Sequence, residues 1–145
     1  MDTGFYPEPN YILATTGGLG YAMVSYWLGI LEVWYVTVLW TLVLSMTSLW
    51  FHIGRSYTAY RIDNFTALTL VILCLYEGWT RGMIAFGITL LSILYGALVF
   101  YIGYIGKCFA FHPDRLIATL YHASMHIVSM LAFLLIATLF PIQAV

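Results

Sequence analysis

Apolar residues along the chain form five long blocks that are separated by short polar stretches. The blocks cover residues 11–30, 33–53, 65–79, 83–105 and 116–140, and Pro141 ends the last of them. About 20 apolar residues span a bilayer as a helix, and helices are expected because lipid leaves every backbone polar group to be satisfied internally. The pattern therefore predicts five transmembrane helices. The short connections predict that neighbouring helices pack as antiparallel hairpins.

The composition agrees with this interpretation. Hydrophobic residues make up 63% of the 145 positions and charged residues only 8%, and the mean hydropathy is +0.93. A soluble domain has about half apolar and about a quarter charged residues. We therefore predict an all-α integral membrane protein, a single bundle of about five transmembrane helices over residues 1–145. The net charge of −1 gives no indication of a nucleic-acid partner.

The few charged residues predict an orientation in the membrane. Four of the five positive charges follow the second or fourth block: Arg55, Arg61, Lys107 and Arg115. The opposite side has only Arg81, beside two glutamates. Because Lys and Arg are enriched in cytoplasmic loops, we expect the 54–63 and 106–115 loops and the N-terminus on the cytoplasmic or matrix side. The N-terminal segment is acidic and lacks the basic start of a signal or transit peptide, so we expect a mature end or an uncleaved first span.

Five reactive side chains lie where these blocks end or begin: Ser48, His52, Asp63, His122 and His126. Ser48 and His52 are four residues apart, as are His122 and His126, so each pair occupies one helix face. The second span ends, and the third and fifth spans begin, on the same side of the membrane in the predicted topology. We therefore expect all five side chains to meet at a similar depth in the bundle.

Three converging histidines indicate a metal site. Catalytic zinc sites commonly use three protein ligands, and a histidine pair four residues apart lets one helix supply two of them. His52, His122 and His126 are then the predicted ligands. Asp63 would accept a proton from water held by the metal, and Ser48 would hydrogen-bond that water or a developing oxyanion. This set of groups fits hydrolysis of an amide or an ester.

A structural interpretation of the same residues stays open. Intramembrane histidines can be satisfied by neighbouring hydroxyls or carbonyls, and polar side chains also hold helices together. Asp63 can cap the third span or pair with Arg55 or Arg61. His112, in the connection before the last span, is assigned no role.

The spacing of these residues resembles the CREST superfamily of membrane proteins, which includes the alkaline ceramidases, the progestin and adiponectin receptors and the myomaker-like proteins. "SLWFH" followed by "YRID" is similar to the alkaline ceramidase pattern, and "YHASMH" is similar to the last-helix histidine pair of the superfamily. The resemblance implies that His52, His122 and His126 bind zinc and that Asp63 and Ser48 assist a zinc-bound water. Members have a seven-helix core, whereas five spans are predicted here. The absence of two helices preserves the side of the membrane on which each site residue lies.

Two classes of function are therefore considered. The first is a zinc-dependent, ceramidase-like hydrolase that acts on an amide or ester of membrane lipids. The second is a non-catalytic small subunit of a larger respiratory or photosynthetic membrane complex. In that case the histidines are structural or bind haem or quinone, and His52 with His122 or His126 could ligate a haem iron. A transporter is disfavoured, because there is no intramembrane charge ladder and no obvious inverted repeat.

Overall fold

A computed structural model describes residues 8–31 and 34–141 of the chain. These residues form helices and short connections without any strand, so the prediction of an all-α bundle is confirmed. The elements in chain order are α1 (Tyr11–Leu13), the π-helix η1 (Ala14–Leu19), α2 (Gly20–Ile30), α3 (Tyr35–Gly54), α4 (Tyr57–Thr80), α5 (Met83–Ala97), the π-helix η2 (Leu98–Ile102), α6 (Gly103–Gly106), the 3-10 helix η3 (Phe109–Phe111) and α7 (Arg115–Leu139). The predicted start of the second span at residue 33 lies outside the described residues.

Four helical runs are long and apolar enough to cross a membrane. They are α3, α4, the run Met83–Gly106 and α7, and they fit a multi-pass integral membrane protein. The run from α1 to α2 covers the first predicted span but is not one of the four. Threonines and glycines in its first half lower the hydropathy of that run.

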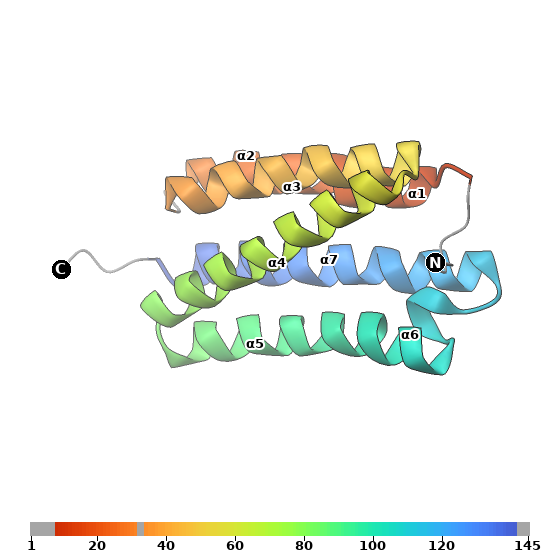
Figure 1. Ribbon diagram of the computed structural model, residues 1–145. Helices are drawn as coiled ribbons and strands as arrows, with labels where there is room; N and C mark the ends of the chain where they lie inside the picture. Colours follow the sequence, from red (N-terminus) through yellow and green to blue (C-terminus); the bar gives the residue numbers. More distant parts are fainter. Residues whose placement is uncertain (1–7, 32–33, 142–145) are drawn as a thin grey trace.

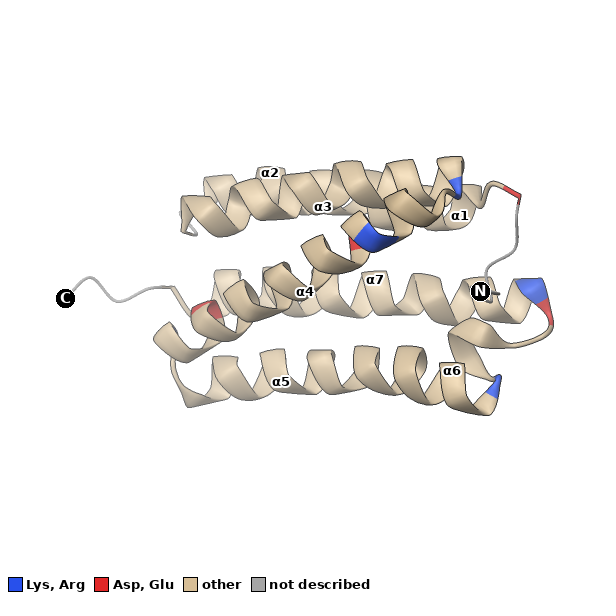
Figure 2. Cartoon of the chain, in the orientation of Figure 1, with Lys and Arg blue, Asp and Glu red and all other residues tan. Residues whose placement is uncertain are grey.

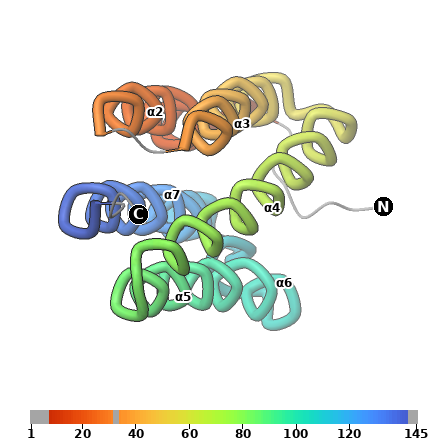
Figure 3. Tube along the Cα trace, turned by 90° about the vertical axis from the view of Figure 1, so that its left-hand side faces the viewer, coloured from red at the N-terminus to blue at the C-terminus, as the bar shows by residue number. Residues whose placement is uncertain are grey.

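The helices pack as a bundle in which α7 is central. α2 and α3 form a hairpin along one side of α7, and α5 lies along the other side (Figures 1 and 3). α4 runs obliquely across the bundle from the end of α3 to the start of α5 (Figure 1). Apolar side chains from all five of these helices meet in one core cluster: Tyr21, Val24, Leu28, Leu44, Leu70, Ala85, Phe133, Ile136 and Ala137.

The third helix begins earlier than the apolar pattern predicted. α4 starts at Tyr57, and the Ser56 side chain caps it by accepting a hydrogen bond from the backbone N–H of Ala59 at 3.1 Å. The prediction of a loop over residues 54–63 is therefore wrong for most of its length. Ser56 provides the N-cap, so the alternative that Asp63 caps this helix is also wrong. The polar residues of the first two turns are tolerated because most of them lie toward the outside of the bundle.

Positive charge gathers at one end of the bundle. Figure 2 shows the Lys and Arg positions near the end of α3, the beginning of α4, α6 and the beginning of α7. At the opposite end, Arg81 pairs with Glu77 at 3.1 Å, and both side chains are almost fully buried. Thr37 of α3 donates a hydrogen bond to Glu77 at 3.0 Å, and Arg81 donates one to the carbonyl of Phe140 at 2.8 Å. This network joins α3, α4 and the end of α7.

Candidate metal centre

The structure brings the three predicted histidines together near the end of the bundle where four of the five Lys and Arg residues lie. His52 comes from the last turn of α3, and His122 and His126 come from successive turns of α7. One ring nitrogen from each side chain lies within 4.8 Å of the others. The ring centroids are 5.0 Å apart for His122 and His126, 5.2 Å for His52 and His122, and 5.6 Å for His52 and His126.

Two of the three histidines are buried, and not all of the polar atoms are satisfied. His52 is 0% exposed, and neither of its ring nitrogens has a hydrogen-bond partner among the described residues. Buried polar groups in proteins are nearly always paired, because an unpaired one costs about 1–3 kcal/mol. His122 is also buried, at 8% exposure. Three imidazoles whose nitrogens converge form a donor set that zinc accepts, so the side chains fit a metal ion.

His126 has an additional partner that the sequence did not reveal. The Thr16 hydroxyl oxygen, in η1, lies 3.0 Å from Nδ1 of His126. Metal-binding histidines usually donate their second ring N–H to a nearby oxygen of a carboxylate, a carbonyl or water, which fixes the orientation of the ring. The hydroxyl oxygen of Thr16 is placed to accept in the same way. The sequence shows Thr16 only as a polar residue within the first apolar block. No pattern in the sequence connects this residue with His126 of the last helix.

The first helical run approaches the site closely because of Gly17. A β-carbon at position 17 would lie 2.2 Å from Oγ of Ser48 and 2.8 Å from Cε1 of His126. Only glycine fits this distance without a shift of its neighbours. Gly17 lies within the π-helix η1, and π-helical segments often occur at functional sites. The run α1–η1–α2 therefore forms one wall of the site.

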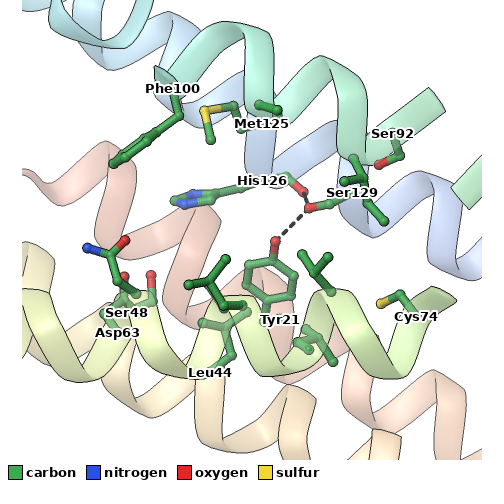
Figure 4. A pocket seen from close by; sticks show the side chains of 18 of the residues that line it. Tyr21, Leu44, Ser48, Asp63, Cys74, Ser92, Phe100, Met125, His126 and Ser129 are labelled. Carbon is green, nitrogen blue, oxygen red and sulfur yellow. Dashed lines mark hydrogen bonds between the residues drawn. The ribbon is translucent and has the colours of Figure 1, made fainter. Parts of the chain in front are cut away.

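A cavity of about 280 Å³ extends from the histidines into the bundle. His122, His126, Ser48 and Asp63 all line it, so four of the five predicted site residues face a common space. The remaining one, His52, is not among the lining residues. Oδ1 of Asp63 accepts a hydrogen bond from the hydroxyl of Thr47 at 3.1 Å, and Thr47 directly precedes Ser48 in α3. Figure 4 shows Ser48 and Asp63 at the same end of the cavity.

Beyond the histidines the cavity is mostly apolar. Figure 4 shows Leu44, Phe100 and Met125 around it, and Tyr21, whose hydroxyl points to Ser129. The Tyr21 and Ser129 oxygens are 2.5 Å apart, and Ser129 donates to the carbonyl oxygen of His126 at 2.9 Å. Tyr21 and Ser129 were not predicted from the sequence, where a tyrosine in a membrane span is usually a packing or interfacial residue.

The cavity reaches the outside of the bundle where α4 and η2 contribute exposed lining residues. Leu68 of α4 and Tyr101 of η2 both line the cavity and are 55% and 57% exposed. These residues lie in helices long and apolar enough to cross a membrane. The opening therefore faces the region that lipid chains would occupy around the bundle.

Comparison of the chain with known protein families, curated proteins and solved structures gave no significant match.

Proposed function

We propose that the protein is a membrane-embedded, zinc-dependent hydrolase that cleaves an amide or ester of a membrane lipid. The observation that supports this most directly is the convergence of three histidine nitrogens within 4.8 Å, one of them from a fully buried side chain without a hydrogen-bond partner among the described residues. A zinc-dependent hydrolase is also supported by the resemblance to the CREST superfamily. This resemblance lies in the spacing of Ser48, His52, Asp63 and the histidine pair.

His52, His122 and His126 would hold the ion. When bound, zinc polarises a carbonyl oxygen and lowers the pKa of water toward about 7. Asp63 faces the same cavity and acts as the general base that accepts the proton of the attacking water. Thr47 holds one carboxylate oxygen of Asp63, which leaves the other for this proton. The Ser48 hydroxyl donates a hydrogen bond to the oxyanion that develops on the substrate.

The cavity supports a lipid as the substrate. Its wall is mainly aliphatic and aromatic, and the carboxylate of Asp63 lies with Ser48 toward the histidine end. An acyl chain would occupy the apolar part while its amide or ester group lies at the histidines. The exposed lining residues Leu68 and Tyr101 mark where a lipid would enter sideways from the bilayer.

The arrangement of the rings favours an ion over haem. Two histidines ligate a haem iron from opposite faces of a flat macrocycle. Here three imidazoles lie edge to face with their centroids 5.0–5.6 Å apart, and His52 is enclosed and does not line the cavity. A small ion fits among these rings more readily than a macrocycle does.

We further propose that the histidine end of the bundle faces the cytoplasm or matrix. Four of the five Lys and Arg residues lie at that end, and Arg81 lies at the other: Arg55, Arg61, Lys107 and Arg115 are the four. The distribution of positive charge is the main determinant of orientation in such proteins. Labelling of Lys107→Cys, in a Cys108→Ser background, by a membrane-impermeant thiol reagent in sealed vesicles of known sidedness tests this orientation.

Hydrolysis of N-acyl and O-acyl lipids by the protein in liposomes tests the proposed activity. Asp63→Asn should keep bound zinc and lower turnover about 100-fold or more, because a general base contributes about 10²–10⁴-fold. Asp114→Asn is the matched control, since Asp114 caps α7 away from the cavity and asparagine is an equally good cap. Turnover that survives in Asp63→Asn and in metal-free protein would overturn the proposal.

A further inference from the structure

We propose that Thr16 is a positioning residue that keeps the Nδ1 nitrogen of His126 protonated and so makes Nε2 the metal-binding atom. This inference rests on the proposed metal site, but it concerns a residue outside the predicted ligand set. Its physical basis is the hydrogen-bond arrangement around one hydroxyl group.

The Thr16 hydroxyl has one proton and three neighbours. Its oxygen lies 3.0 Å from the carbonyl oxygen of Ile12, 3.4 Å from that of Leu13 and 3.0 Å from Nδ1 of His126. The two carbonyl oxygens can only accept, and threonine hydroxyls in helices commonly donate to the carbonyl four residues earlier, so we assign the hydroxyl proton to the backbone. The Thr16 oxygen then accepts a hydrogen bond from His126. Nδ1 of His126 therefore carries the proton, and Nε2 keeps its lone pair.

The surrounding helix holds Thr16 in this position. Gly17 packs against Ser48 and His126 at a distance that only glycine permits, which sets the depth of η1 in the bundle. At the start of the run, the Asn10 backbone N–H donates to the carbonyl of His52 at 2.9 Å, and the Asn10 side chain donates to Thr119 of α7 at 2.7 Å. The segment that bears Thr16 is thus tied to both helices that bear the histidines.

The ring of His126 is also restricted from the other side. The Tyr21 ring packs edge-on against it with the centroids 5.9 Å apart. The hydrogen bond between Thr16 and Nδ1 and the packing of the Tyr21 ring both oppose a rotation of the His126 ring that would exchange its two nitrogens. His52 has no such hydrogen-bond partner among the described residues. His126 would therefore be a pre-oriented ligand, whereas His52 would be fixed by the ion itself.

The ¹⁵N chemical shifts of the histidine rings in zinc-free, detergent-solubilised protein test the inference directly. We expect the Nδ1–H tautomer for His126 in the wild type and in Thr16→Ser, which keeps the hydroxyl. We expect the Nε2–H tautomer or a mixture in Thr16→Val, which has the same shape without it. An Nε2–H tautomer in the wild type, or an unchanged tautomer in Thr16→Val, would overturn the inference.

Zinc affinity provides the second measurement. Loss of a partner of this kind typically weakens metal binding roughly 10–100-fold, so we expect this for Thr16→Val and near-wild-type affinity for Thr16→Ser. Thr138→Val is the matched control, because the Thr138 hydroxyl makes the same bond to a carbonyl four residues earlier on an exposed helix face. Equal zinc affinity in Thr16→Val and wild type would overturn the positioning role and leave the zinc site intact. A wild type that binds no zinc but shows the expected tautomers would overturn the proposed function and retain the role of Thr16 in setting the tautomer.

Discussion

The His52 and His122 rings lie edge to face with their centroids 5.2 Å apart and an interplanar angle of 81°, although they belong to α3 and α7. The contact places two polar rings against each other in the interior of the bundle. An ion between them would satisfy one of the two His52 nitrogens that the described part of the protein leaves unpaired. The stability of the protein should therefore depend on His52 in opposite ways with and without zinc.

Replacement of His52 by leucine tests this dependence. In zinc-free protein, His52→Leu should raise the free energy of unfolding by about 1–3 kcal/mol, because it removes buried polar atoms that lack partners. With excess zinc, the wild type should gain stability and the variant should not. Denaturant unfolding in mixed micelles, with and without a chelator, measures both effects. A variant that is less stable than wild type in the chelator would show that His52 has a structural role.

Replacement of Gly17 by alanine tests the close approach of the first helical run. The added β-carbon would lie 2.2 Å from Oγ of Ser48, so neighbouring groups must shift. Overpacking of this kind typically costs about 1–3 kcal/mol and should also weaken zinc binding. Gly87→Ala in α5 is the control, because a β-carbon there meets nothing within 4 Å. This control should be neutral or more stable by about 0.5–1 kcal/mol. Equal effects of the two substitutions would argue against the tight packing at Gly17.

The ion pair at the opposite end of the bundle should be essential for folding. Removal of one partner of a buried pair leaves an uncompensated charge and costs about 3–5 kcal/mol, so Glu77→Gln should strongly destabilise the protein. The pair between Glu8 and Arg115 is the comparison, because the Glu8 side chain is 72% exposed. Glu8→Gln should cost less than about 1 kcal/mol. Thermal unfolding of both variants measures the difference, and similar losses would contradict the burial of the Glu77–Arg81 pair.

The sequence predicted the helical bundle and the meeting of the three histidines for a simple reason. Long apolar blocks determine which segments span the membrane. The number of spans between two helix ends then determines whether these ends lie on the same side of the membrane. The start of α4 at Tyr57 was missed because its first turns carry polar residues that resemble a loop when read alone. A capping serine at position 56 was the available sign.

The contribution of the first helical run could not be predicted in this way. The contact between Thr16 and His126 depends on how η1 is rotated about its axis and how deeply it packs. Those quantities follow from tertiary packing at Gly17 and from a π-helical segment, and neither has a reliable local pattern in the sequence. The apolar cavity is likewise a property of helix angles, especially the oblique path of α4 (Figure 1).

The most direct test of the central claim is metal content. Elemental analysis should measure zinc and iron together in each of three gently purified proteins: wild type, His122→Ala and His112→Ala. We predict about one zinc per chain in the wild type, loss of this zinc in His122→Ala, and its retention in His112→Ala, whose histidine lies outside the cluster. Iron in place of zinc would move the site to haem chemistry and to the membrane-complex alternative. A wild type without either metal would contradict the metal site.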